Sequence, residues 1–213
     1  MSEPTAANYP HDLVENLRLP DGTPVVIRPI ASMDRRRHWR FICSLSLQTR
    51  YHRLMSARCL LPGELRRMVE IDYRREMALV VLTRIGDEEQ QLGVARFVRE
   101  DEDSDSAEFA IVVADAWQRR GIGRQLLVSL RRAATAAGVN QMGGITLATN
   151  TAMLRLARRL GLEVSREPDD WTVKRLGWHQ PWSTPEPLSA APKTSATASA
   201  SVIAAATAAA AAQ

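Results

Sequence analysis

One strand–turn–helix segment, residues 107–127, constrains the fold of this chain more than any other part of it. The segment starts with an apolar run, AEFAIVVA at 107–114, and enters a helical pattern at Gly121 and Gly123. Unpaired N–H groups and the helix dipole favour an anion at a helix start. Glycines let a pyrophosphate approach the backbone there, although many such turns contain glycine for purely steric reasons. The segment predicts an α/β fold and a candidate anion site.

Apolar periodicity predicts the elements around this segment. The helix over 121–137 has the clearest pattern, with Ile122, Leu126 and Leu130 on one face. Residues 87–91 are predicted to be a polar turn. The other strands are predicted over 22–30, 77–83, 92–98, 144–149, 163–166 and 171–176, and the other helices over 34–44, 49–55, 62–71 and 150–160.

The chain is predicted to contain one folded domain with a flanking segment on each side. Residues 1–21 have no strong periodicity and are predicted to be an N-terminal extension. Residues 22–178 hold all the periodic elements. Residues 179–213 are rich in Pro, Ser and Ala, and an alanine-rich segment without larger apolar residues has little to dock with. We therefore expect a disordered tail there.

The turn belongs to a longer motif. Residues 118–123 read QRRGIG and fit the pattern Gln/Arg-x-x-Gly-x-Gly/Ala, which directly follows a strand in the GNAT superfamily of N-acyltransferases. About 30 residues further on, that superfamily typically has an asparagine motif followed by Leu-Gly-Phe. The matching residues here are Asn150, Met153, Leu154, Leu160 and Gly161, with Leu162 in place of the Phe. The chain thus resembles the superfamily over 22–178, which implies the GNAT fold, a mixed central β-sheet with helices on both faces.

Within the superfamily, the chain most resembles the acetyltransferase domain of bacterial protein-lysine acetyltransferases. The shared features are GTPVVIRPI at 22–30, LSLQTRYHR at 45–53, and Ala107-Glu108 ahead of the cofactor motif. The resemblance implies an enzyme that moves an acetyl group from acetyl-CoA to a primary amine, with a protein lysine as the leading hypothesis. A small-molecule amine acetyltransferase and a non-catalytic acyl-CoA-sensing module are the alternatives.

Amine acetylation needs a base, because a lysine amine is protonated near pH 7. Glu108 is the candidate, since it lies on the strand beside the cofactor motif. In the enzymes that this chain resembles, a glutamate at this position is the general base. The alternative is a solvent-facing residue on an alternating strand. Asp72, Glu76 and Asp115 are weaker substitutes.

The resemblance also implies how acetyl-CoA is held. A splayed strand after Glu108 would supply backbone N–H groups to the acetyl and pantetheine arm, and the turn would bind the pyrophosphate. Asn150 would either reach the pantetheine arm or simply cap its helix. The predicted cofactor-binding residues are Val112, Val113, Ala114, Gln118, Arg119, Arg120, Gly121, Ile122, Gly123, Arg124 and Asn150.

One departure from the superfamily concerns the general acid. Many GNAT enzymes have a tyrosine seven residues after the asparagine, where it protonates the departing CoA thiolate. This chain has Ala157 at that position. We therefore expect the thiolate to leave unassisted or to take a proton from water.

The sequence argues against several other classes of protein. Its four histidines and two cysteines have no metal-ligand spacing, so we expect no metal site. It has no apolar stretch near 20 residues and no secretory signal, which predicts a cytoplasmic protein without a membrane span. The net charge of +4 is modest, and the arginine run at 35–40 is interpreted as a solvated helix face. Nucleic acid is therefore an unlikely partner.

Overall fold

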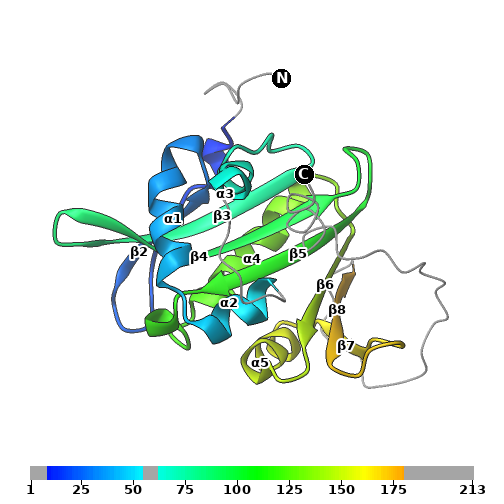
Figure 1. Ribbon diagram of the computed structural model, residues 1–213. Coiled ribbons are helices and arrows are strands. Elements are labelled where there is room, and N and C mark those ends of the chain that lie inside the picture. The colour runs from blue at the N-terminus through cyan, green and yellow to red at the C-terminus, as the bar shows by residue number, and fades with distance from the viewer. Residues whose placement is uncertain (1–8, 55–61, 180–213) are drawn as a thin grey trace.

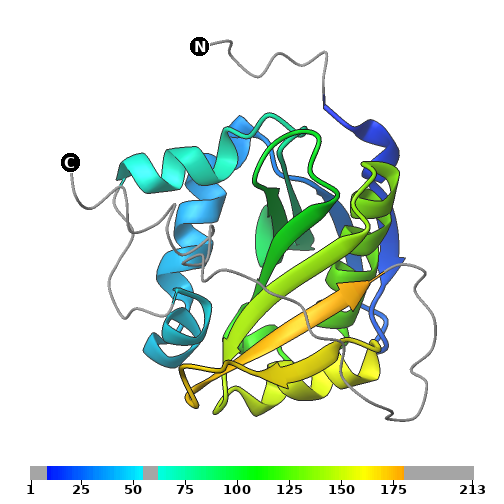
Figure 2. The same cartoon turned by 90° about the vertical axis from the view of Figure 1, so that its right-hand side faces the viewer.

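A computed structural model describes residues 9–54 and 62–179, which form a mixed eight-stranded sheet with helices on both faces (Figures 1 and 2). The strand order is β1-β2-β3-β4-β5-β6-β8-β7, and only the β5–β6 pair is parallel. The strands are β1 (Glu15–Arg18), β2 (Pro24–Pro29), β3 (Glu76–Ile85), β4 (Glu88–Arg99), β5 (Ser106–Val113), β6 (Gln141–Leu147), β7 (Glu163–Arg166) and β8 (Val173–His179). The helices are α1 (Arg35–Ser44), α2 (Leu47–Leu54), α3 (Pro62–Val69), α4 (Ile122–Ala136) and α5 (Thr151–Arg159), with short 3-10 turns at His11–Leu13, Ser32–Asp34 and Asp115–Trp117.

The sheet separates two apolar layers, as its alternating side chains require. On one face, Leu126 and Leu130 of α4 are completely buried against residues such as Phe109 of β5. On the other face, Phe41 of α1 packs in a second cluster that includes Val112 of β5. β5 therefore contributes to both layers, and its even-numbered residues face α1, α2 and α3.

The predicted α/β fold with helices on both faces is confirmed, with three corrections to its elements. Residues 15–18, predicted to lie in an extension, form β1 and pair with β2. Their sequence, ENLR, has no β-branched residue, and only alternate positions are partly buried at this sheet edge. The turn predicted at 87–91 is shorter and consists of Gly86 and Asp87, because β4 already begins at Glu88. The strand predicted at 144–149 is β6, which covers 141–147. The predicted tail lies almost entirely outside the described residues.

Two features are absent from residues 9–54 and 62–179. Among them, no helix is long and apolar enough to cross a membrane. The same residues include no group of three or more His, Cys, Asp or Glu side chains arranged to hold a metal ion.

Candidate active site

β5 and β6 form a wedge that opens beyond Glu108. The two strands pair over three residues only, and the last pair is Glu108 with Gly143. β5 then continues alongside β4 to Val113, whereas β6 diverges from β5 and stays paired with β8 to Leu147 (Figure 1). A Cβ atom on Gly144 would lie 2.9 Å from the carbonyl oxygen of Phe109, so glycine is required where the strands begin to separate.

Backbone groups of β5 point alternately toward β4 and into the wedge. The N–H of Ala114 donates to the carbonyl of Leu92 at 2.8 Å, and the unbroken register makes Val112 point the same way. Ile111 and Val113 therefore direct their N–H groups into the wedge. Of the three predicted backbone donors, only Val113 has this orientation, and Ile111 joins it. The sequence could not reveal this alternation, because it depends on the register with β4.

The turn before α4 has a backbone suited to an anion. Arg119 (φ 62°) and Gly121 (φ 89°) are both left-handed, and such residues in a turn direct successive N–H groups into one concavity. Gly121 is the N-cap of α4, and no described side chain caps this helix. The first intrahelical bond runs from Gln125 N–H to Gly121 O. The N–H groups of residues 122–124 are therefore available to phosphate oxygens.

The two glycines of the motif have different physical roles. Gly121 supplies the left-handed conformation, which other residues adopt at a cost. At Gly123, a Cβ atom would lie 3.1 Å from Cδ2 of Leu156, so its missing side chain lets α4 begin against α5. The steric interpretation thus applies to Gly123, and the anion-binding interpretation rests on Gly121.

The three arginines around this turn are exposed. The guanidinium of Arg120 stacks on Trp117, 4.7 Å from the ring centroid, and lies 3.5 Å from the carboxylate of Asp21. Arg119 and Arg124 form no ion pair with any residue that the structure describes. These two side chains are therefore the cations best placed to respond to a bound phosphate.

Asp115 ties α2 to the same turn. Its carboxylate accepts hydrogen bonds from Ser46 N–H (2.9 Å), Ser46 Oγ (2.7 Å) and Thr49 Oγ1 (2.6 Å). Partial desolvation opposes ionisation, but these bonds hold the pKa of Asp115 below its ordinary value. Gln118 Nε2 donates to Thr49 Oγ1 at 3.3 Å and to the carbonyl of Val113 at 3.1 Å. Asp115 and Gln118 thus hold the turn in place, and Asp115 is a poor candidate for the base.

Glu108 lies half-buried at the apex of the wedge, on the face covered by α1, α2 and α3. The guanidinium of Arg53, near the end of α2, interacts electrostatically with its carboxylate. Burial and, to a smaller extent, the charge of the neighbouring Arg96 lower the pKa of Arg53 to about 10, against the effect of Glu108. Neither arginine was selected from the sequence, because the packing of α2 on the sheet brings Arg53 to Glu108 and the pairing of β3 with β4 brings Arg96 to Glu76.

A second carboxylate, Glu76, lies in the same cross-strand row. Glu76 of β3 and Glu108 of β5 are both in register with Val98 of β4, so all three side chains share one face. Arg96 Nη1 is 3.6 Å from Glu76 Oε2, and Arg96 Nη2 donates to the carbonyl of Met68. Desolvation raises the pKa of Glu76, although the charge of Arg96 opposes the increase.

His38 of α1 lies completely buried on this face. Burial, the charge of Arg96 and, to a smaller extent, the charge of Arg53 lower its pKa to about 4, against the effect of the bond to Gln91. His38 Nδ1 is 3.2 Å from Gln91 Oε1, and Gln91 Nε2 reaches the carbonyl of Gly93 at 3.4 Å. Gln91 Nε2 also lies 3.1 Å from His38 Nδ1, so the amide can serve this nitrogen as acceptor or as donor. A neutral histidine therefore accompanies two guanidinium groups and two carboxylates here.

Three other predicted positions have clear local surroundings. Asn150 Oδ1 accepts from Met153 N–H at 3.1 Å and its Nδ2 donates to Thr146 Oγ1 at 3.2 Å, so the helix-cap interpretation is confirmed. Its contact with the cofactor stays a prediction. Ala157 is completely buried in the core beside α4. Asp72 accepts backbone N–H groups of its own turn, which explains its presence structurally.

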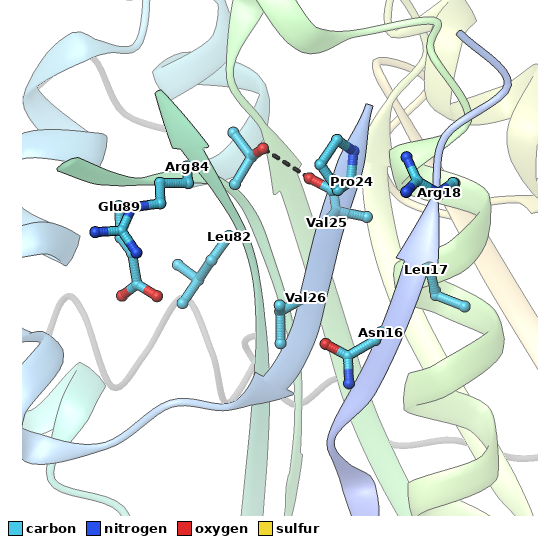
Figure 3. A pocket seen from close by; sticks show the side chains of 10 residues that line it. Asn16, Leu17, Arg18, Pro24, Val25, Val26, Leu82, Arg84 and Glu89 are labelled. Atoms are coloured by element: carbon cyan, nitrogen blue, oxygen red, sulfur yellow. Dashed lines mark hydrogen bonds between the residues drawn. The ribbon is translucent and has the colours of Figure 1, made fainter. Parts of the chain in front are cut away.

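A pocket of about 450 Å³ lies away from the wedge, on β1–β4 (Figure 3). The dashed hydrogen bond in Figure 3 runs from Thr83 Oγ1 to the carbonyl of Pro24 at 2.7 Å. The only carboxylate lining this pocket, Glu89, is paired with Arg37 at 2.6 Å. None of its lining residues belongs to the wedge or the turn, so we do not include it in the site.

Comparisons with known proteins agree with the geometry. The family described as acetyltransferase (GNAT) domain matches residues 25–163. Acetyltransferase PA5475 of Pseudomonas aeruginosa is 35% identical over 155 residues, which cover 72% of this chain and 83% of that protein. Acetyltransferase Pat of Mycolicibacterium smegmatis is 33% identical over 141 residues, 66% of this chain and 42% of that protein. The solved GNAT domain of S. lividans PAT has 25% identity and a TM-score of 0.73, covering 81% of this chain and 99% of that one.

Proposed function

This chain belongs to the GNAT acetyltransferase family, and from that premise we propose that it transfers the acetyl group of acetyl-CoA to the ε-amine of a protein lysine. One observation carries the proposal. Glu108 is the last residue of β5 that pairs with β6, and the next wedge-facing N–H groups lie open beyond it. A base and the donors for a thioester oxygen therefore meet at one point.

The described residues fit acetyl-CoA without further assumptions. The uncapped start of α4 and the left-handed turn suit its pyrophosphate. The N–H groups of Ile111 and Val113 suit the carbonyl groups of the pantetheine arm and the thioester. When bound, acetyl-CoA supplies an acetyl group already activated as a thioester.

The chain's own groups would handle the proton and the developing charge. Glu108 accepts a proton from the incoming ammonium, directly or through water, which leaves a neutral amine able to attack. The nearby cations Arg53 and Arg96 disfavour a further positive charge at this face and so assist that loss. The wedge N–H groups stabilise the negative charge that develops on the thioester oxygen. Because Ala157 carries no acid, the thiolate leaves unassisted or takes a proton from water.

The choice of a protein lysine as acceptor rests on sequence resemblance to protein-lysine acetyltransferases. The segment LSLQTRYHR at 45–53, which carries that resemblance, supplies all but the last residue of α2. α2 packs on β5 and β6 and contributes Arg53 beside the base. The residues that carry the resemblance thus include one that lies beside the proposed base, which supports the choice of acceptor.

The first experiment incubates the protein with labelled acetyl-CoA and a cell lysate. The second measures acetyl-CoA affinity and a pH–rate profile for wild type and Glu108→Gln. We expect label on protein lysines, and Glu108→Gln should lower the rate by about 10²–10⁴-fold. The affinity for acetyl-CoA should hardly change. The defect should shrink as the pH rises toward the acceptor's own pKa, where more amine is already neutral. Glu163→Gln, which changes an exposed strand glutamate, is the matched control.

Each other result points to a specific error. Label confined to small molecules would make the lysine assignment wrong while leaving the chemistry intact. Acetyl-CoA binding without transfer in the wild type would indicate the sensing module. A full-rate Glu108→Gln enzyme would place the base elsewhere.

A further inference from the structure

Glu76 and Glu108 flank Val98 at a defined separation. Arg99 N–H donates to the carbonyl of Arg75, so Val98 forms a non-hydrogen-bonded pair with Glu76 and a hydrogen-bonded pair with Glu108. These pair types separate Cα atoms by about 4.5 and 5.5 Å. The Cα atoms of the two glutamates are therefore about 10 Å apart. Both side chains are long enough to bring a carboxylate over Val98.

The surface between the two glutamates is open. Residues 91–97 of β4 are all buried, but Val98 is partly exposed. The side chain of Glu76 keeps 26% of its exposure, and Glu108 is also partly exposed. A slender cationic group can therefore reach Val98 from solvent and meet a carboxylate on either side.

The charges behind this row are balanced before an acceptor arrives. Arg96 lies 3.6 Å from Glu76, and Arg53 interacts with Glu108. An ammonium that enters adds one positive charge to a half-buried region, which is costly unless a carboxylate contacts it. Transfer of one proton to Glu108 neutralises the amine but leaves the total charge of the region unchanged, and the excess charge is removed when Glu108 passes that proton to solvent.

Resting on the function proposed above, we propose that Glu76 is a specificity-determining residue, whose carboxylate binds the acceptor amine as an ammonium over Val98. Glu108 then takes one proton: an N–H bond of the ammonium breaks, an O–H bond forms on Glu108, and a neutral amine with its lone pair remains. This arrangement favours acceptors that arrive charged, such as a lysine ε-amine, over amines that arrive neutral.

The test compares two amines at pH 9 with the full chain. The ε-amine of Nα-acetyl-lysine amide, with an ordinary pKa of about 10.4, arrives mostly as an ammonium. Glycinamide presents an α-amine, a class with an ordinary pKa of about 8, and arrives mostly neutral. Steady-state kinetics and acetyl-CoA affinity are measured for wild type, Glu76→Gln and Glu70→Gln. Glu70 pairs with Arg66 on α3 and controls for general loss of negative charge.

For the lysine derivative, Glu76→Gln should raise KM roughly tenfold, with little change in kcat, because a charge-assisted hydrogen bond is lost. For glycinamide the change should stay below about twofold, since no ammonium is bound. Acetyl-CoA affinity and the Glu70→Gln enzyme should match wild type.

Several results would overturn this inference. If Glu76→Gln leaves the KM for the lysine derivative unchanged, Glu76 does not bind the acceptor. An equal loss for both amines would show that Glu76 only supports Arg96. If wild type does not acetylate glycinamide, the effect of Glu76→Gln on the KM for the lysine derivative decides whether Glu76 binds the acceptor. If wild type binds acetyl-CoA but acetylates neither amine nor lysate protein, the proposed function itself is wrong, and this inference fails with it.

Discussion

The buried His38 makes a quantitative prediction about stability and pH. Its pKa is about 4 in the folded protein, against about 6.5 in an unfolded chain. Between these values the unfolded chain binds one more proton, so stability rises with pH. The contribution is complete above pH 6.5 and is lost as the pH falls from 6.5 to 4. Each pH unit inside that window is worth about 1.4 kcal/mol.

Lowering the pH from 7.5 to 5 should therefore cost wild type about 2 kcal/mol through His38 alone. For a domain of this size, that corresponds to a decrease in Tm of about 4–8 °C. The assay is urea unfolding at both pH values for wild type and His38→Gln. The variant should lose about 2 kcal/mol less than wild type.

The comparison isolates His38, because other groups that titrate in this range are common to both proteins. His179→Gln, at the exposed end of β8, should behave like wild type. The charged groups that face His38 are Arg96 of β4, Arg53 of α2 and Asp34 before α1. All three are present in both wild type and His38→Gln. If His38→Gln loses as much stability as wild type, the argument from burial and the two arginines is refuted.

Two further predictions concern the cofactor turn. Gly121→Asp should abolish the stabilisation by acetyl-CoA, about 2.7 kcal/mol at 100 times its Kd, because the carboxylate opposes the pyrophosphate. Gly138→Asp introduces the same charge and backbone strain (φ +80°) beyond the other end of α4, and it should keep the thermal shift; equal loss in both variants would remove the turn from the site. Asp115→Ala removes the acceptor for Ser46 and Thr49 and should cost about 1–2 kcal/mol in urea unfolding; unchanged stability would mean that α2 does not depend on this anchor.

The sequence predicted best where a local pattern determines structure by itself. The 3.6-residue period after Gly121 identified α4, and the strand at 163–166 was predicted at its observed bounds. Asn150 caps α5 as expected. In each case the signal lies within about 15 residues, so no long-range contact is needed to interpret it.

Features that depend on register could not be predicted from one sequence. The alternation that assigns Ile111 to the wedge follows from the β4–β5 pairing. The row of Glu76, Val98 and Glu108 joins residues from three strands, and their spacing along the chain contains no sign of it. β1 was missed because ENLR is half-exposed and lacks β-branched residues.

α2 links the turn before α4, where we propose that the cofactor binds, to Glu108, the proposed base. Ser46, Thr49 and Arg53 are spaced by three and four residues, which places them on one side of a helix. The first two contact Asp115 at the start of the cofactor turn, and the third interacts with Glu108. One inserted residue within α2 would rotate the following positions by about 100° and separate the two contacts. The spacing within LSLQTRYHR is therefore the one that lets a single helix contact both Asp115 and Glu108.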